Sequence, residues 1–374
     1  MDQGLALSVV SLAVAGVVLV FTASFATAGR LASIEGLGDP YRFLKAQVAY
    51  GLFGGFLMVV VSQMGPGFFR RAAPWAYGLA VVLLVAVLVF GRELGGSRRW
   101  LQIGPITFQP SEFAKLALVL FLARFLSDRG QQLGRFRTCL RALGYAAAVA
   151  GLTVVEPDLG TAALLCLIGL LMLFLAGARL WQVGSIALAA GAAVAWVILH
   201  YDYMRERMLA FWDPVGHVDN SGYHVIRMLV ALATGGWRGT GLGEGVEKWS
   251  LPARHTDSIY CVVGEELGVL GCVLLLALFV WFARRAFAVA LQAPDSFTQL
   301  AAGGLAGAIT LQAALNIAVA TACLPVTGVT LPFVSSGGSS LAMMLIAAGI
   351  LLSISRLRPA AAAEPDEAPP GAGR

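Results

Sequence analysis

Long apolar runs, each about the length that crosses a bilayer, follow one another along almost the whole chain. A transmembrane helix needs about 20 consecutive apolar residues to cross the hydrocarbon core. Runs of this kind occupy residues 5–28 and then about 43–64, 75–91, 111–128, 139–155, 159–177, 181–200, 258–283, 297–321 and 332–355. The pattern predicts an all-α, polytopic integral membrane protein with about ten transmembrane helices.

Two stretches interrupt this pattern. One is a large outside loop of about residues 201–257, in which the amphipathic sequence YHVIRMLVALATGG predicts a short helix at the membrane interface. The other is the Pro/Ala/Gly-rich stretch 359–374, which lacks an apolar period and is expected to be a disordered cytoplasmic tail. Residues 1–358 therefore form the predicted transmembrane domain.

Composition agrees with a membrane protein and argues against other classes. Hydrophobic residues make up 58% of the 374 and charged residues 13%, about half the charged fraction of a soluble domain. The five cysteines form no CxxC pair, which argues against a zinc or redox site. The net charge of +5 is modest, and no basic stretch is typical of a protein that binds nucleic acid.

Positive charge is distributed unequally between the predicted connections. Ten spans place both termini on one side, and with the termini in the cytoplasm the positive-inside rule is met. Basic residues also cluster outside, at Arg92, Arg98 and Arg99 and between residues 205 and 254, where an anionic ligand would explain them. The arginines on the inside are Arg70, Arg71, Arg129, Arg135, Arg137, Arg141, Arg179, Arg284, Arg285, Arg356 and Arg358.

The first polar cluster lies in GRELGGSRRWLQIGPITFQPSEFAK, before the fourth predicted span. Pro110 and Ser111 are typical of a helix N-terminus. Glu112 and Lys115 follow three residues apart, so they share a helix face and can form an ion pair. Either this pair only holds helices together, or it lines a polar cavity within the membrane.

Asp158, Arg205 and Arg207 each allow two interpretations. Asp158, in EPDLGTA, can cap a helix that starts at Leu159, or it can belong to a polar site. Arg205 and Arg207 begin the large loop after an aromatic residue, as in an interfacial aromatic–basic belt. The two arginines could also contact lipid head groups or a pyrophosphate.

Asp257 lies where the large loop enters an apolar run. It could be the N-cap of the helix that follows. A carboxyl group at a membrane mouth would also be partly desolvated, which raises its pKa toward the range of a general base. Glu265 and Glu266 lie about two turns deeper, and we expect one of them to face the bundle and pair with a cation such as Lys115.

The stretch LPVTGVTLPFVSSGGSS, before the last span, is rich in Pro, Gly and Ser. Irregular backbone at membrane depth is tolerated only where it is buried in protein or lines a cavity. Asn316, in the preceding span, is a further inward-facing candidate. Together these residues predict a polar cavity that opens outside and accepts an anionic amphiphile, for transport or for catalysis.

Several of these stretches, in this order, resemble the SEDS family of shape, elongation, division and sporulation proteins. They are RRWLQIGPITFQPSEFAK, EPDLGTA, GLGEGVEKWSLPARHTD, GEELGVLG and LPVTGVTLPFVSSGGSSL. The resemblance extends to about Arg358, and the later motifs look more like FtsW than RodA. It implies a peptidoglycan glycosyltransferase that polymerises lipid II on the outer face of the bacterial cytoplasmic membrane.

The resemblance also implies partners, a cofactor and site residues. A class B penicillin-binding protein, the transpeptidase, is the expected partner, with other division or elongation proteins and membrane lipid. A divalent cation, Mg²⁺ or Mn²⁺, is expected, and no organic cofactor. Asp257, in the HTD motif, is the implied catalytic residue, as base or as metal ligand. The resemblance also implies that Arg99, Trp100, Glu112 and Lys115 belong to the site. With these, the candidate substrate-binding residues are Arg99, Trp100, Gln109, Ser111, Glu112, Lys115, Asp158, Arg205, Arg207, Lys248, His255 and Ser339.

The chain departs from the family pattern close to Asp257. Ser258 stands where the motif usually reads HTDF, Ser336 stands at the aromatic position of SYGGS, and Ala253 replaces the acid of LPE. These departures put in question how the acceptor sugar packs around Asp257.

Two alternative functions belong to other classes. A lipid II flippase, a transporter, would also need a polar path and basic groups, but it predicts ionisable residues toward the cytoplasmic half. The dense clusters here lie in outside loops and at the outer ends of spans. A scaffold that only recruits the division machinery would not explain Asp257.

Overall fold

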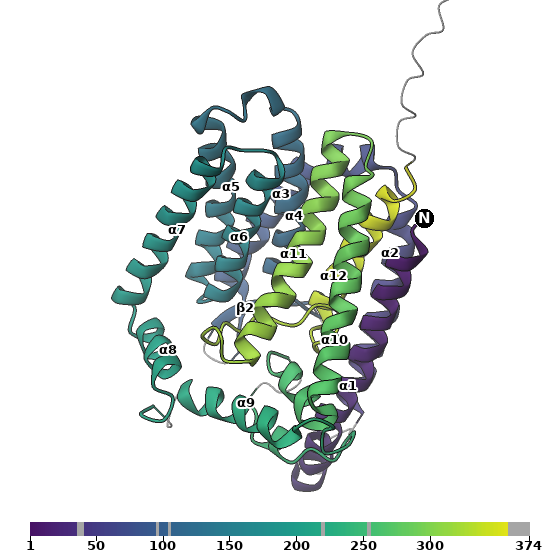
Figure 1. The fold of residues 1–374 in the computed structure, drawn as a ribbon, viewed down its shortest axis with the longest axis vertical. Helices are drawn as coiled ribbons and strands as arrows, with labels where there is room; N and C mark the ends of the chain where they lie inside the picture. The colour runs from purple at the N-terminus through teal and green to yellow at the C-terminus, as the bar shows by residue number, and fades with distance from the viewer. Residues whose placement is uncertain (36–40, 95–96, 104–105, 218–220, 253–255, 358–374) are drawn as a thin grey trace, which may run out of the picture.

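The computed structural model describes residues 1–35, 41–94, 97–103, 106–217, 221–252 and 256–357. Within these ranges, ten helices of 17 to 33 residues form a bundle (Figure 1), and each coincides with one predicted span. They are α1 (Gln3–Glu35), α2 (Arg42–Ser62), α3 (Pro66–Phe90), α4 (Pro110–Ser127), α5 (Phe136–Val155), α6 (Leu159–Leu175), α7 (Leu180–His200), α10 (Ile259–Leu291), α11 (Ser296–Ala320) and α12 (Gly338–Ile354).

The composition of these helices is that of a membrane bundle. In the described part of the chain, six of them (α1, α2, α3, α5, α10 and α11) are long and apolar enough to cross a bilayer. Three others (α6, α7 and α12) are apolar but shorter, and α4 carries Glu112, Lys115 and Arg124. The predicted all-α, multi-pass membrane fold is confirmed, and the number of ten crossings stays a prediction.

Burial divides the helices into a core and a periphery. Most side chains of α4 and α12 are buried, whereas α2, α3 and α7 expose large apolar residues such as Phe56, Val82 and Leu188. α4 packs against α3, α6 and α11, and α12 packs against α2. Apolar side chains thus cover the outside of the bundle, as a lipid environment requires.

Four helix boundaries differ from the predicted ones. α1 extends to Glu35, beyond the predicted end near residue 28. α3 begins at Pro66 rather than near residue 75, because the fixed φ of a proline suits the first helical position. α10 extends to Leu291, beyond the predicted end near 283. α12 begins only at Gly338, because the segment before it is held by other contacts, such as the Ser335 hydroxyl donating to the carbonyl of Thr256 (2.5 Å).

A three-stranded antiparallel sheet joins α3 to α4, where the sequence predicts only a loop with Gly turns. Its strands, β1 (Arg92–Leu94), β2 (Ser97–Ile103) and β3 (Ile106–Phe108), lie in the order β1-β2-β3. Two of them have three residues, too few to show the alternation by which strands are recognised in a sequence. The sheet places Arg99 and Trp100, both on β2, at one end of the bundle.

The large loop between α7 and α10 contains two helices, α8 (Asp202–Trp212) and α9 (Ser221–Gly235), and the 3₁₀ turn η2 (Glu247–Trp249). α9 confirms the short helix predicted in this loop. A second 3₁₀ turn, η1 (Gly130–Gln132), lies between α4 and α5. His255 and the predicted tail, residues 359–374, lie outside the described residues.

α10 is interrupted at Gly268, where φ is 66° and ψ is −163°. The loop after α9 supplies backbone partners on both sides of this break. Before the break, the backbone N–H groups of Thr240 and Gly241 donate to the carbonyls of Glu265 (2.9 Å) and Glu266 (3.0 Å). After it, the N–H groups of Val269 and Leu270 donate to the carbonyls of Gly236 (2.9 Å) and Trp237 (3.3 Å). The first turns of α10 are therefore a separate segment whose position depends on the loop.

Candidate active site

Asp257 lies at the start of α10. The segment between α11 and α12, residues 321–337, which we call the irregular segment, folds back against it. The N-cap position of α10 belongs to Ser258, so the capping interpretation of Asp257 is wrong. The Asn316 side-chain amide donates to the carbonyl of Asp257 (3.0 Å), and the Ser335 hydroxyl donates to that of Thr256. α11 and the irregular segment thus fix the backbone that carries Asp257.

Two glycines allow the irregular segment to pass close to the carboxyl groups. Gly328 has φ 77°, and a Cβ placed on it would lie 3.7 Å from Asp257 Oδ2. Gly160, in the first turn of α6, approaches more closely, since a Cβ there would lie 2.2 Å from the carbonyl oxygen of Thr327. A side chain at position 160 would push this segment away from α6.

Neighbouring charges and burial set the acidity of Asp257. Burial raises the pKa of this carboxyl group to about 6, because it disfavours the charged form, and the Asp158 carboxylate adds to the effect. The guanidinium groups of Arg99 and Arg207 act in the opposite direction. A carboxyl group with this pKa is mostly ionised at pH 7 and still accepts a proton readily, which suits a general base.

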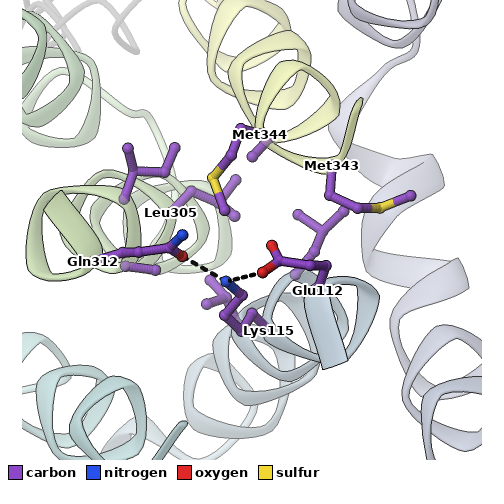
Figure 2. Close-up of a pocket in the computed structure, with 11 residues that line it drawn as sticks. Glu112, Lys115, Leu305, Gln312, Met343 and Met344 are labelled. Carbon is purple, nitrogen blue, oxygen red and sulfur yellow. Dashed lines mark hydrogen bonds and ion pairs between the residues drawn. The ribbon is translucent and has the colours of Figure 1, made fainter. Parts of the chain in front are cut away.

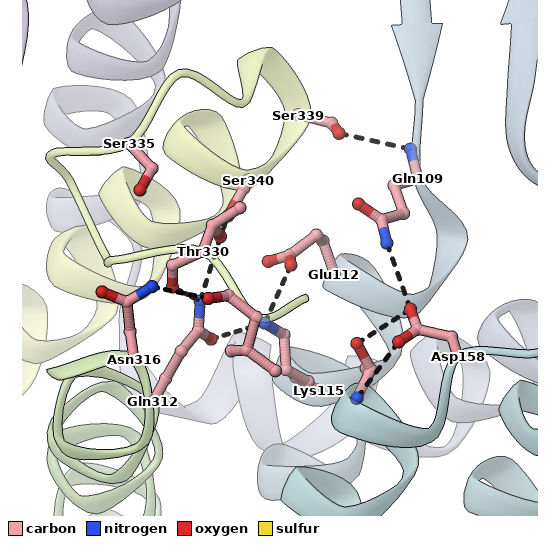
Figure 3. A network of polar contacts seen from close by, with 12 residues as sticks. Gln109, Glu112, Lys115, Asp158, Gln312, Asn316, Thr330, Ser335, Ser339 and Ser340 are labelled. Carbon is pink, nitrogen blue, oxygen red and sulfur yellow. Dashed lines mark hydrogen bonds and ion pairs between the residues drawn. The ribbon is translucent and has the colours of Figure 1, made fainter. Parts of the chain in front are cut away.

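Arg99 and Asp158 connect the sheet to the start of α6. Asp158 accepts from the backbone N–H (3.2 Å) and the hydroxyl (2.9 Å) of Thr161, which confirms the predicted cap. The Gln109 amide lies 3.5 Å from Asp158 (Figure 3). Arg99 Nη1 lies 3.8 Å from Asp158 Oδ1. Arg99 also donates to the carbonyl of Glu156 (3.3 Å). Asp158 is therefore both a cap and a member of the polar cluster around Asp257, which also includes Arg99 and Glu156.

A second polar network lies between α4, α11 and the irregular segment (Figure 3). Lys115 Nζ donates to Glu112 Oε1 (2.9 Å) and to Gln312 Oε1 (2.5 Å), which confirms the predicted ion pair. The Gln312 amide donates onward to the carbonyl of Thr330 (3.0 Å). Figure 2 shows the cavity beside this pair, which is about 20 Å³, room for about one water molecule. The network positions helices and has no space for a sugar.

Glu265 and Glu266 are both fully buried, and neither pairs with Lys115. Glu266 Oε1 accepts from Lys248 Nζ (2.6 Å), and the Glu265 carboxylate accepts from the backbone N–H groups of Glu247 (2.6 Å) and Lys248 (2.8 Å). The expected internal cation exists, but Lys115 is the wrong partner, because the loop folds onto α10. Lys248 is 2% exposed, which argues against its predicted contact with substrate.

The two predicted arginines of α8 have different surroundings. Arg207 donates to the carbonyl of Val326 (2.9 Å), and its charge lowers the pKa of Asp257, so it belongs to the cluster. Arg205 is exposed.

The other predicted residues lie where the sheet meets α4. Ser339 Oγ accepts from the backbone N–H of Gln109 (3.2 Å), and Trp100 is half-buried on β2. Ser111 is buried in the first turn of α4, and its hydroxyl has no hydrogen-bond partner among the described residues.

The structure accounts for the unusual Ser258. Its side chain is buried, its hydroxyl donates to the carbonyl of Pro252 (3.1 Å), and it lies 2.9 Å from His224 Nε2. Since the single hydroxyl proton goes to Pro252, the imidazole N–H donates to Ser258. Ser258 therefore links the start of α10 to His224 on α9. The sequence gives no sign that His224 takes part in this contact.

Glu156 is a second carboxyl group that the sequence prediction missed. It is buried, and its carboxylate oxygens have no hydrogen-bond partner among the described residues. Burial, with the Asp158 carboxylate adding to it, raises the pKa of Glu156 to about 8, and Arg99 opposes this shift. Glu156 is the first residue of the motif EPDLGTA, but the helix cap predicted at Asp158 already explained this motif, so nothing in the sequence singled out Glu156.

The described part of the site holds too few ligand side chains for a metal ion bound by the protein alone. In the described ranges, no group of three or more His, Cys, Asp or Glu side chains could hold one. Asp257 lies instead in the field of Arg99 and Arg207, and Asp158 lies beside Arg99.

Known proteins resemble this chain over nearly its full length. Residues 3–359 match the cell cycle protein family of FtsW, RodA and SpoVE. The probable peptidoglycan glycosyltransferase FtsW of Thioalkalivibrio sulfidiphilus is 38% identical over 363 residues, 95% of this chain and 90% of the relative. Peptidoglycan glycosyltransferase MrdB of Escherichia coli K12 is 39% identical over 312 residues, 82% of this chain and 83% of the relative.

A solved structure has the same fold. It belongs to a peptidoglycan synthase complex described as coordinating polymerization and crosslinking, and its chain superposes with a TM-score of 0.78 at 32% identity. The superposition covers 96% of this chain and 98% of the other. The likeness therefore includes the whole bundle and the large loop.

Proposed function

This chain belongs to the FtsW, RodA and SpoVE family of cell cycle proteins, and we propose that Asp257 is the base of its reaction. It is a multi-pass membrane protein and a peptidoglycan glycosyltransferase, the activity named in its relatives. The substrate we infer is lipid II, whose diphosphate and polyprenyl chain make it an anionic amphiphile of the kind that the polar cluster and apolar surface would accept.

The proposed reaction extends a glycan by one lipid II unit. Asp257 takes the proton of the acceptor GlcNAc 4-hydroxyl, and that oxygen attacks C1 of the donor MurNAc. The bond between C1 and the diphosphate oxygen breaks, and undecaprenyl pyrophosphate leaves with the electron pair. Attack opposite the α-linked leaving group gives a β-linked product, so the step inverts configuration and needs one base rather than the two carboxyl groups of a glycoside hydrolase.

The observation that supports this role is the difference between three neighbouring carboxyl groups. Asp158 is committed to the cap of α6. Glu156, with a pKa of about 8, holds its proton at neutral pH. Asp257, with a pKa of about 6 at the mouth of α10, is the one that is both mostly ionised at pH 7 and able to accept a proton.

The departing pyrophosphate needs positive charge. Arg99 and Arg207 act on Asp257 from the sheet and from α8, so a diphosphate next to Asp257 would be close to both. Fixed cations aimed at charge that develops on a leaving group are among the larger contributions to catalysis. Arg205, exposed on α8, is available to the same head group.

A divalent cation, Mg²⁺ or Mn²⁺, is a separate proposal. Mg²⁺ is commonly held by one or two carboxylates together with substrate phosphates, so Asp257 would be its protein ligand once a lipid diphosphate is bound. The ion would supply charge neutralisation for the leaving group. Loss of activity in EDTA that Mg²⁺ or Mn²⁺ restores would support it, and full activity in EDTA would rule it out.

We also propose a transpeptidase partner and an orientation. The similar solved chain comes from a complex that coordinates polymerization and crosslinking, which supports a class B penicillin-binding protein as partner, with other division or elongation proteins. The distribution of arginines supports a bacterial cytoplasmic membrane protein with cytoplasmic termini and Asp257 near the outer face. A flippase is not favoured, because the relatives are named glycosyltransferases and the cavity beside the Glu112–Lys115 pair holds only about one water molecule.

The deciding experiment is polymerisation of purified lipid II by this protein with its cognate transpeptidase. Asp257→Ala and Asp257→Asn are each expected to lose about 10²–10⁴-fold in rate, the usual contribution of a general base. Retained melting temperature and co-purification with the partner show that the variants are folded. Glycan synthesis by folded, partner-bound Asp257→Ala at the wild-type rate would overturn both the base and the metal-ligand proposals.

A further inference from the structure

Four exposed arginines gather at the starts of α5 and α7, and we define them as the arginine patch: Arg135, Arg137, Arg141 and Arg179. Arg135 is the N-cap of α5, and Arg137 and Arg141 lie one turn apart on that helix. Arg179 comes directly before α7 and reaches the α5 side, since a Cβ on Gly134 would lie 3.9 Å from its Nη2. Figure 1 shows these helix starts side by side.

The arginine patch has no acidic counterpart. From residue 129 to 155 and from 176 to 201 the sequence contains no Asp or Glu. None of the four arginines is in an ion pair with another described residue, and the nearby Asp128 is occupied by Arg70 and Arg124. α5 and α7 both begin next to these arginines, and the N-terminus of a helix is the positive end of its dipole. The positive potential here is unbalanced within the described protein.

An apolar surface continues directly from the arginines. The rings of Phe136 and Trp181 stack with centroids 5.8 Å apart and an interplanar angle of 7°, although both are exposed. Leu140 and Leu188 are also exposed further along α5 and α7. Aromatic residues of this kind mark the level of the head groups, and the aliphatic residues beyond them lie where acyl chains lie.

We propose that the arginine patch binds the phosphate group of an anionic phospholipid. The Phe136–Trp181 stack would lie at the level of the head group, and the acyl chains would lie along α5 and α7. A topology signal would explain positive charge at this end but requires neither a cluster without acids nor an exposed stacked pair. An acidic protein segment would satisfy the arginines and leave the apolar surface uncovered. A phospholipid satisfies both.

This lipid site is distinct from the glycosyltransferase site. α5 begins at the arginine patch and ends at Val155, directly before Glu156 of the Asp257 cluster. Its 20 residues separate the two sites by about 30 Å. Loss of the lipid site would therefore leave Asp257 and its neighbours in place.

Native mass spectrometry of the purified full-length protein in detergent tests the proposal. Dioleoyl phosphatidylglycerol is titrated against dioleoyl phosphatidylcholine, which has the same acyl chains and no net charge. We expect the wild type to retain phosphatidylglycerol preferentially, and R137Q/R141Q/R179Q to weaken that binding at least about tenfold. The matched control, R71Q/R284Q/R356Q, removes the same charge from exposed positions outside the patch and should bind as the wild type does.

Several outcomes would overturn the proposal. They are equal retention of the two lipids by the wild type, equal loss in the control variant, and unchanged binding in the patch variant. Displacement of the lipid by inorganic phosphate at a few millimolar would show a simple anion site, and displacement by a polyglutamate peptide would show a protein-binding surface. If the triple variant does not fold, R141Q and Trp181→Ala must each weaken phosphatidylglycerol binding.

Discussion

Asp257 changes its charge near neutral pH, and at the scale of single residues this property should control the rate. Its pKa is raised to about 6, and a base must be ionised to accept a proton. We expect kcat/KM for lipid II polymerisation to be level above about pH 7 and to fall about tenfold per pH unit well below pH 6. A profile that stays flat from pH 5 to 8 would contradict the assignment of Asp257 as base.

Glu156 should make stability depend on pH in the opposite sense. Its pKa rises from 4.5 in an unfolded chain to about 8 in the protein, so the folded state keeps a proton that the unfolded state loses. Stability should therefore fall as pH rises from about 4.5 to about 8. Glu156→Gln removes this dependence, so at pH 8 its melting temperature should exceed that of the wild type by a few degrees. Glu206→Gln, at an exposed position on α8, is the control and should change neither the pH dependence of stability nor the melting temperature at pH 8.

The contact between His224 and Ser258 should act as a unit. Because the two side chains meet at 2.9 Å beside Asp257, removing either one removes the same link between α9 and α10. We expect His224→Ala to lower kcat about fivefold, the value of one hydrogen bond. Ser258→Ala also removes the bond to Pro252, so it should cost at least as much, and the double variant should be no slower than Ser258→Ala. Multiplying losses would show independent roles. His200→Ala, on the exposed end of α7, is the control.

Single residues divide into those that sequence could identify and those that needed the fold. The Glu112–Lys115 pair could be predicted, because a three-residue spacing fixes a helix face. The place of Asp257 at the mouth of a span could also be predicted, because a charge beside an apolar run stands out, while its role stays a prediction. The partner of Glu266 could not, because Lys248 reaches it only through the path of the loop. Glu156 and His224 carried no signal beyond their identity.

At the scale of elements, the break in α10 explains why the loop before it is rich in glycine. Gly239 and Gly243 both have positive φ, 77° and 86°, but only Gly239 touches α10, where a Cβ would lie 2.1 Å from the carbonyl oxygen of Glu266. Gly239→Ala should displace the first turns of α10 and lower both melting temperature and activity. Gly243→Ala introduces the same backbone strain, but its side chain would enter open space. It should therefore lower the free energy of unfolding by only about 1–2 kcal/mol. Equal effects of the two substitutions would show that strain, not the contact with α10, matters.

The elements themselves were predictable to the extent that their signals are local. Hydropathy located the ten long helices, since each carries its own apolar run. The break at Gly268 was not predictable, because its hydrogen-bond partners lie near residues 236–241, more than 25 residues earlier. The sheet was missed because its hydrogen bonds, rather than a pattern within each short strand, define it.

At the scale of the whole molecule, the bundle separates two chemistries. Arginines without acidic partners lie at one end, and the carboxyl groups and arginines around Asp257 lie at the other, about one helix length away. This arrangement suits an enzyme that joins sugars on one side of a membrane while both termini stay on the other. The orientation can be tested with a thiol that the chain already has.

Cys323 follows α11 at the same end as Asp257 and is exposed, whereas Cys139 and Cys261 are buried. If that end faces outward, a membrane-impermeant maleimide should label wild-type protein in intact spheroplasts, and Cys323→Ser should abolish most of the label. A Cys323→Ser protein that also carries Arg71→Cys, at the opposite end of the bundle, should be labelled only after permeabilisation. The reverse pattern would place Asp257 on the cytoplasmic side, where the proposed outer-face polymerisation could not occur.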